Sequence, residues 1–210
     1  MRSGFSLVEV LVAVLVFAIA GGMGLALLSG SLTSRDTLQQ RQDALARLDT
    51  TRILLRDDLG QLAMRATRTG DGRTTDIVFA GAQDGVAIWR APSRDERIIL
   101  ALTRRGWANP GGLAPRGSLQ RVEYLLTSEG LERRVTAYPD AVEQTPVTTR
   151  LLVPGAGSAS VDFLYGDQWR ARGAVSTQAG GDRGPQAVRL RYALPPLGDV
   201  EHVVLVGGPS

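Results

Sequence analysis

The chain begins MRSGFSLVEVLVAVLVFAIAGG (residues 1–22), and this stretch decides how the rest of the sequence is interpreted. No charged residue occurs from Val10 to Leu28, and a run of about 19 apolar positions is long enough to cross a bilayer as a helix. Arg2 and the α-amine place positive charge on the short segment before it, which predicts a cytoplasmic N-terminus. The other residues, roughly 180 of them, would then lie across the membrane.

The unusual residue in this stretch is Glu9, a carboxylate just inside the apolar run. A charge within a membrane helix costs roughly 2.5–3.5 kcal/mol on insertion scales, so it persists when a partner offsets that cost. Two simpler interpretations stay open. Ala18-Ile19-Ala20 matches the cleavage pattern of a secretory signal peptide, although the apolar run continues beyond it. Alternatively, the segment is a plain signal anchor with the carboxylate at the membrane interface.

Composition limits the function classes. The 210 residues are 43% hydrophobic and 21% charged, which is typical of a folded chain and allows a membrane segment plus one domain. The formal net charge is only +3, and the basic residues are scattered without interleaved aromatics, so we expect no binding to nucleic acid. There is no cysteine, which excludes disulfides and thiolate chemistry.

Beyond the membrane segment, apolar residues recur with helical spacing. They are Leu38, Leu45, Leu48, Leu55, Leu59, Leu62 and Ala66. The pattern predicts one helix from about Phe5 to about Ala66, stopped by the glycines that follow, with an amphipathic second half. An alternative is two helices broken near Gly30.

After Gly72 the apolar period changes to two, which is typical of strands. The expected strands lie near residues 77–79, 86–89, 98–102, 122–126, 131–137, 161–165, 188–194 and 200–206, with loops at 109–117, 154–160 and 172–185. A turn at residues 128–130 joins two of them in a hairpin. We therefore predict an α+β fold, with a long N-terminal helix packed on an antiparallel β-domain of eight to ten strands.

The residues for catalysis or metal binding do not assemble in this sequence. It has one histidine, His202, in an apolar run where a structural strand histidine is the better interpretation. Asp57 and Asp58 are expected to face solvent near the helix end, and Arg133 and Arg134 to be solvated strand positions. We predict no enzyme activity, no catalytic residue, no metal site and no cofactor.

Gly4-Phe5-Ser6-Leu7-Val8-Glu9 resembles the signature of type IV prepilins. The resemblance implies that a prepilin peptidase cuts between Gly4 and Phe5 and methylates the new amine of Phe5. It also implies that Glu9, the fifth residue of the mature chain, pairs with the N-terminal amine of a neighbouring subunit during assembly.

Three mid-chain segments extend the likeness: TRRGWANP (103–110), SLQRVEY (118–124) and GLERRV (130–135). They resemble the J-type minor pseudopilin of type II secretion systems. This implies a pilin-like fold and a tip complex with I-type and K-type minor pseudopilins, which primes the pseudopilus and supports export of folded proteins across the outer membrane.

The implied organisation is a leader (1–4), a transmembrane helix (5–29), a periplasmic amphipathic helix (30–66) and a periplasmic β-domain (67–210). The chain would be anchored once in the inner membrane. The helix face expected to meet the partner, in part, consists of Leu45, Leu48, Leu55, Leu59 and Leu62. The sequence leaves open a minor pilin of a type IV pilus, which shares the N-terminal signature, and a membrane-anchored or secreted periplasmic enzyme or carrier.

Overall fold

The computed structural model describes residues 6–69, 71–106, 118–142, 144–178, 184–194 and 197–207, and within the helix it does not describe the side chains of 26–34. Two compact units make up the chain, Met1–Asp43 and Ala44–Ser210. Gly4 and Phe5 lie outside the described residues, as does the second half (107–110) of the 103–110 segment of the predicted J-type signature.

A single α-helix, α1 (Leu7–Gly60), runs through the first unit and into the second without the alternative break near Gly30. Ser6 caps its start, because the Ser6 hydroxyl accepts a hydrogen bond from the Val8 amide at 3.3 Å.

The prediction that the helix continues to Ala66 is wrong. After Gly60 the chain turns extended and pairs with the last residues of a strand, where the Ala63 amide donates to the Thr103 carbonyl at 2.9 Å. The Gly207 amide donates to the carbonyl of Leu59 at 2.9 Å, which satisfies one of the free carbonyls at the helix end.

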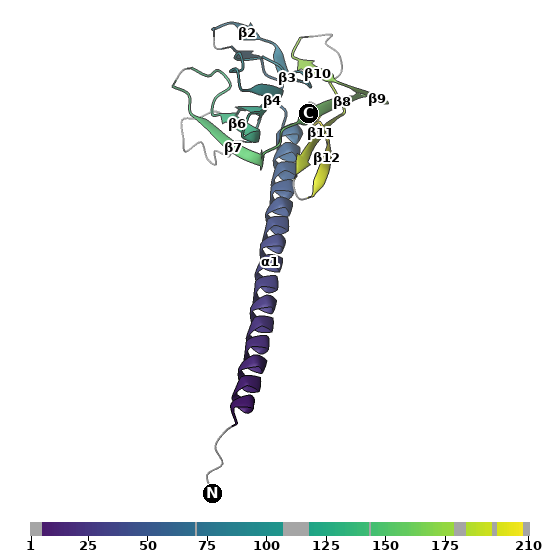
Figure 1. Ribbon diagram of the computed structural model, residues 1–210. Coiled ribbons are helices and arrows are strands. Elements are labelled where there is room, and N and C mark those ends of the chain that lie inside the picture. The colour runs from purple at the N-terminus through teal and green to yellow at the C-terminus, as the bar shows by residue number, and fades with distance from the viewer. Residues whose placement is uncertain are drawn as a thin grey trace. The chain divides into compact units, whose positions relative to one another are not determined.

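The second unit contains all twelve strands that the structure describes. They are β1 (Thr67–Arg68), β2 (Thr74–Thr75), β3 (Ile77–Ala82), β4 (Arg97–Arg104), β5 (Gln120–Leu126), β6 (Gly130–Thr136), β7 (Val147–Pro154), β8 (Ala159–Tyr165), β9 (Gln168–Arg170), β10 (Arg172–Ser176), β11 (Ala187–Leu194) and β12 (Gly198–Leu205). Every pairing is antiparallel. The main sheets have six strands in the order β10-β3-β4-β5-β6-β7 and four in the order β12-β11-β8-β9, as can be followed in Figure 1.

The two main sheets meet around Phe163 of β8. Its ring packs edge-on against Phe79 of β3, with the ring centroids 5.8 Å apart. Gly81 and Gly173 leave room for this ring, since a Cβ at either position would come within 2.5 Å of its atoms. The core therefore depends on two strands of the larger sheet approaching one aromatic ring closely.

Most predicted strands are confirmed, including the β5–β6 hairpin with its turn at 128–130. The prediction of a strand at residues 86–89 is wrong, because this segment is a loop that buries Trp89 with Ile98, Ala101 and Leu125 in a small separate cluster. Five strands were missed: the short strands β1, β2 and β9, the longer strand β7, and β10, which lies inside the segment predicted as a loop from 172 to 185. The fold class, α+β with a long helix and antiparallel sheets, is confirmed.

Candidate assembly site

The first unit presents an apolar helix surface with one carboxylate. Leu7–Leu25 of α1 is long and apolar enough to cross a membrane, with a mean hydropathy of 2.3, and none of it is buried within the chain. Glu9 is exposed in this segment, and no hydrogen bond or ion pair of its side chain occurs within the described residues. An apolar surface of this kind, with a carboxylate on it, fits a membrane anchor that packs against other helices.

The structure separates the five leucines of the predicted partner face. Leu55 and Leu59 are fully buried in the chain's own core, so they are not available to a partner. Leu48 and Leu62 are half-buried against that core, and Leu62 no longer belongs to the helix. Leu45 alone is largely exposed, with 51% of its surface accessible.

The buried face of α1 in the second unit is rotated from the predicted one. It consists of Ala44, Leu48, Thr51, Leu55, Asp58 and Leu59. Three of these residues are small, polar or charged, so a search for apolar spacing passes over them. Thr51 satisfies its hydroxyl within the helix by donating to the Arg47 carbonyl at 2.8 Å.

Asp58 is the centre of a buried ion-pair cluster that joins the helix to the six-stranded sheet. Its carboxylate receives two bonds from Arg133 of β6, both at 2.7 Å, and one from the Tyr124 hydroxyl of β5 at 2.7 Å. Arg104 of β4 donates to the same carboxylate and also pairs with Asp57 at 2.7 Å. All hydrogen-bonding positions of the carboxylate are thus occupied from three adjacent strands.

The electrostatics of the cluster follow from burial. Burial raises the pKa of Tyr124 well above its usual value, and the negative charge of Asp58 raises it further, so the hydroxyl stays a donor. Burial alone would lower the pKa of Arg133, but the Asp58 carboxylate outweighs it and raises that pKa. The raised pKa keeps the Arg133 guanidinium positively charged beside this carboxylate.

These contacts overturn two expectations about charged residues. Asp58, expected to face solvent, has no exposed surface, whereas its neighbour Asp57 remains about half exposed. Arg133 and Arg134 are not solvated strand positions, because Arg133 binds Asp58 and Arg134 binds Glu96 at 2.5 Å. In the sequence, the adjacent pairs Asp57-Asp58 and Arg133-Arg134 look polar and exposed. Only the contacts between helix and sheet show which residue of each pair faces the helix–sheet interface.

His202 is a structural strand histidine, as predicted. It lies in β12 with its Nε2 atom 2.8 Å from the Tyr192 hydroxyl of β11. Burial lowers the pKa of His202, and the nearby charge of Arg52 lowers it further, so the neutral ring suits this buried contact. Within the described residues, no three histidine or acidic side chains gather as metal ligands.

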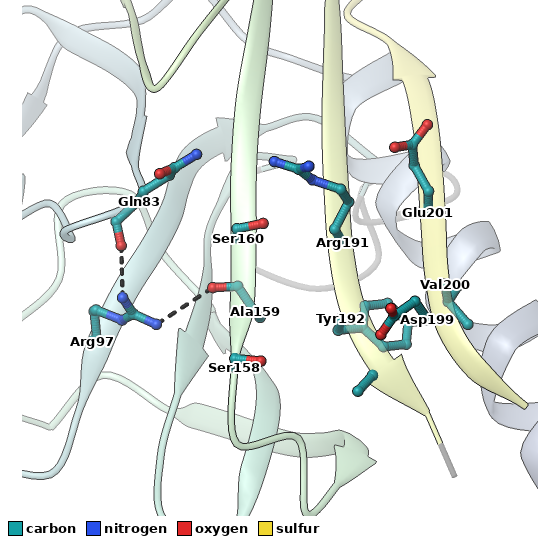
Figure 2. Close-up of a pocket in the computed structure, with 11 residues that line it drawn as sticks. Gln83, Arg97, Ser158, Ala159, Ser160, Arg191, Tyr192, Asp199, Val200 and Glu201 are labelled. Carbon is teal, nitrogen blue, oxygen red and sulfur yellow. Dashed lines mark hydrogen bonds between the residues drawn. The ribbon is translucent and has the colours of Figure 1, made fainter. Parts of the chain in front are cut away.

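A polar cavity of about 630 Å³ lies where the two main sheets adjoin, and Figure 2 shows the residues that line it. Arg97 of β4 lies at one side of it, donating to the Gln83 carbonyl at 2.8 Å and to the Ala159 carbonyl of β8 at 3.4 Å. Arg97 thereby uses its charge to hold the two sheets together.

The comparisons with known proteins agree with this architecture. Residues 1–25 match the model of the prokaryotic N-terminal methylation motif. Residues 26–206 match the model of type II secretion system protein J. The chain belongs to the type II secretion system protein J family. It is therefore a minor pseudopilin, which decides between the pseudopilus and the pilus that the sequence left open.

Relatives and solved structures match over most of the chain. The type II secretion system protein J of Vibrio cholerae is 30% identical over 209 residues, which cover 99% of this chain and 89% of the relative. The protein J of Escherichia coli is 29% identical, covering 100% of this chain and 98% of the relative. A chain in the crystal structure of the GspK-GspI-GspJ complex from enterotoxigenic Escherichia coli matches with a TM-score of 0.60 and 27% identity, covering 80% of this chain and 99% of that one.

Proposed function

We propose that this minor pseudopilin joins I-type and K-type minor pseudopilins in a tip complex that primes the pseudopilus and supports export of folded proteins across the outer membrane. The match of residues 26–206 to the protein J family carries the proposal, and the complex formed by the similar GspJ chain supports it. In this arrangement α1 anchors the chain once in the inner membrane, with its N-terminus cytoplasmic and the β-domain periplasmic. Deleting the gene and measuring exoprotein in the medium tests the role, and undiminished secretion would contradict it.

Processing is proposed between Gly4 and Phe5, with methylation of the Phe5 amine. The methylation-motif match over residues 1–25 supports it. Mass spectrometry of the chain from native membranes should find an N-methylated Phe5 at the mature N-terminus. Gly4→Val should block both processing and secretion while the chain still inserts. A mature chain beginning at Gly21, or retaining Met1, would refute this processing.

Glu9 is proposed to pair with the cationic N-terminal amine of a neighbouring subunit. Such a pair offsets the cost of a carboxylate in the membrane, roughly 2.5–3.5 kcal/mol, and sets the axial register of two helices. Glu9→Ala should insert normally but co-purify poorly with its partners, whereas Ser6→Ala, three positions away, should co-purify normally. Normal co-assembly of Glu9→Ala would exclude this role.

On the second unit, the helix face proposed for the I-type partner differs from the five predicted leucines, because it keeps Leu45 and adds Ile53. Leu45 and Ile53 expose 51% and 65% of their surfaces on α1, while Leu55 and Leu59 are buried. Leu45→Arg and Ile53→Arg should each reduce co-purification with the I-type subunit without unfolding the β-domain. Leu205→Arg, an exposed position on β12, is the matched control. Equal binding by all three variants would remove this face from the interface.

A further inference from the structure

A second cavity, of about 660 Å³, lies on the other side of the six-stranded sheet from α1. Its floor is formed by β5, β6 and β7, and its walls by residues of the β3–β4 loop and of the β6–β7 connection. In the sheet register Arg121 lies opposite Thr136, and Thr136 lies opposite Val147, so these three lining residues form one row across the floor.

Unsatisfied polar atoms collect at this cavity. Within the part of the chain that the structure describes, three buried side-chain polar atoms have no hydrogen-bond partner: Arg90 Nη2, Thr103 Oγ1 and Arg121 Nε. Arg90 and Arg121 line the cavity, and Thr103 is the register partner of Arg121 on β4. Buried polar groups are nearly always satisfied, so three open positions in one place indicate a missing partner.

The shortage of partners is greatest at Arg121. Only 5% of its surface is accessible, and its guanidinium lies 5.0 Å above the Trp89 ring. One of its terminal nitrogens donates to the Arg68 carbonyl, but within the described residues no carboxylate forms an ion pair with it. Burial lowers the pKa of Arg121 to about 10, with Asp140 and Glu123 acting in the opposite direction from farther away.

The neighbouring carboxylates are already occupied. Glu96 accepts from Arg90 at 2.6 Å and from Arg134 at 2.5 Å, and Glu123 accepts from Arg90 at 3.1 Å. Among the described residues that line the cavity, three guanidinium groups therefore face two carboxylates. The surplus is one positive charge, held in a partly desolvated wall where an anion would be bound more strongly than in water.

We propose that this cavity binds the carboxylate of an acidic peptide segment. One carboxylate supplies the single negative charge that Arg121 lacks, whereas a phosphate, at roughly −1.5 to −2, would bring excess charge against Glu96 and Glu123. The volume of about 660 Å³ holds more than a free carboxylate. Thr145 and Thr149 also line the cavity, and a threonine hydroxyl can donate a hydrogen bond to a peptide carbonyl.

Nuclear magnetic resonance of the arginine Nε–H groups tests the site directly. The full chain, labelled with ¹⁵N-arginine in detergent micelles, is titrated with an acetylated and amidated pentapeptide that carries one central glutamate among glycines. We expect saturable shifts of the Arg90 and Arg121 signals. The same peptide with glutamine should bind at least tenfold more weakly. No saturable shift, or equal shifts with both peptides, would overturn the proposal.

Variants and small anions separate the alternatives. Arg121→Gln should abolish the shifts, and Arg90→Gln, at a more exposed position, serves if the first variant does not fold. Arg172→Gln removes an exposed arginine elsewhere on the sheet and should bind normally. Acetate binding as tightly as the glutamate peptide would assign the cavity to a small carboxylate, and phosphate binding more tightly would assign it to phosphate; either result overturns the peptide. Since binding is measured without the secretion machinery, failure here leaves the proposed role in secretion unaffected.

Discussion

Two carboxylates on the same helix have opposite surroundings. Asp58, in the second unit, is fully buried and receives bonds from Arg104, Tyr124 and Arg133 of its own chain. Glu9, in the first unit, is exposed on an apolar surface, with no side-chain partner among the described residues. A buried charge with all its partners in the chain is costly to remove alone, whereas an unpaired charge on an apolar surface points to a partner outside the chain.

The largest effect is expected from removing the partnered carboxylate. Asp58→Ala leaves the Arg133 guanidinium and the Tyr124 hydroxyl without their acceptor and removes one of the two acidic partners of Arg104. Breaking a buried pair in this way costs about 3–5 kcal/mol. Urea unfolding followed by tryptophan fluorescence measures the loss. Asp57→Ala, at the half-exposed neighbour, should cost less than about 1 kcal/mol. Equal losses in both variants would contradict the central role of Asp58.

Glu96, a second carboxylate with partners in its own chain, should make the free energy of unfolding depend on pH. Hydrogen bonds from Arg134 and then Arg90, against the opposing effect of burial, lower the pKa of Glu96 from 4.5 to about 2. Because the folded-state pKa is depressed, the contribution is complete above the unfolded pKa and is lost as the pH falls from about 4.5 to about 2. It amounts to about 3 kcal/mol at most. Glu96→Gln should therefore show a shallower loss of stability over this window than the parent, and parallel curves would refute the assignment.

A smaller loss is expected when Asp58 keeps its charge but loses one donor. Tyr124→Phe removes the 2.7 Å hydrogen bond and leaves the ring in place, which should cost about 2 kcal/mol, as for bonds to charged groups. In a double-mutant cycle with Asp58→Ala the two losses should not add, because they share one interaction. Additive losses would show that the hydroxyl and the carboxylate act independently.

The smallest effect on stability is expected at the carboxylate without partners. Glu9→Gln breaks no contact within the described residues, so the free energy of unfolding of the β-domain should change by less than about 0.5 kcal/mol. Its effect should appear only in co-purification with other pseudopilins. A clear destabilisation of the isolated chain would remove the contrast with Asp58.

The sequence was most informative where one pattern dominates. The apolar N-terminal helix and the alternating strands, such as β5, β8 and β11, follow from hydrophobic period alone. The edge strand β7 was missed because its first residues, Val147 to Arg150, are exposed and carry no alternation. Strand β10 was missed because it lies in a glycine-rich segment and its pairing with β3 is decided by residues far away in the chain.

The sites were harder to predict than the fold, for a related reason. Leu55 and Asp58 turn toward the same sheet, yet only the leucine fits a hydrophobic pattern. A buried charge becomes recognisable when its partners are known, and those of Asp58 come from strands 46 to 75 residues later. The surplus charge of Arg121 is likewise a property of three strands and two loops taken together.

The pairing of β10 with β3 also has a kinetic consequence. Ala82 of β3 pairs with Arg172, about 90 positions later, so in a chain that emerges from its N-terminus the edge of β3 stays open until nearly the whole domain has been made. Strand β8, which carries Phe163, is separated from β10 only by the short strand β9. The pairing that covers the edge of β3 therefore forms late in synthesis. The growing chain exposes an unpaired, apolar edge until then, which is when a chaperone would protect it and a protease would cut it.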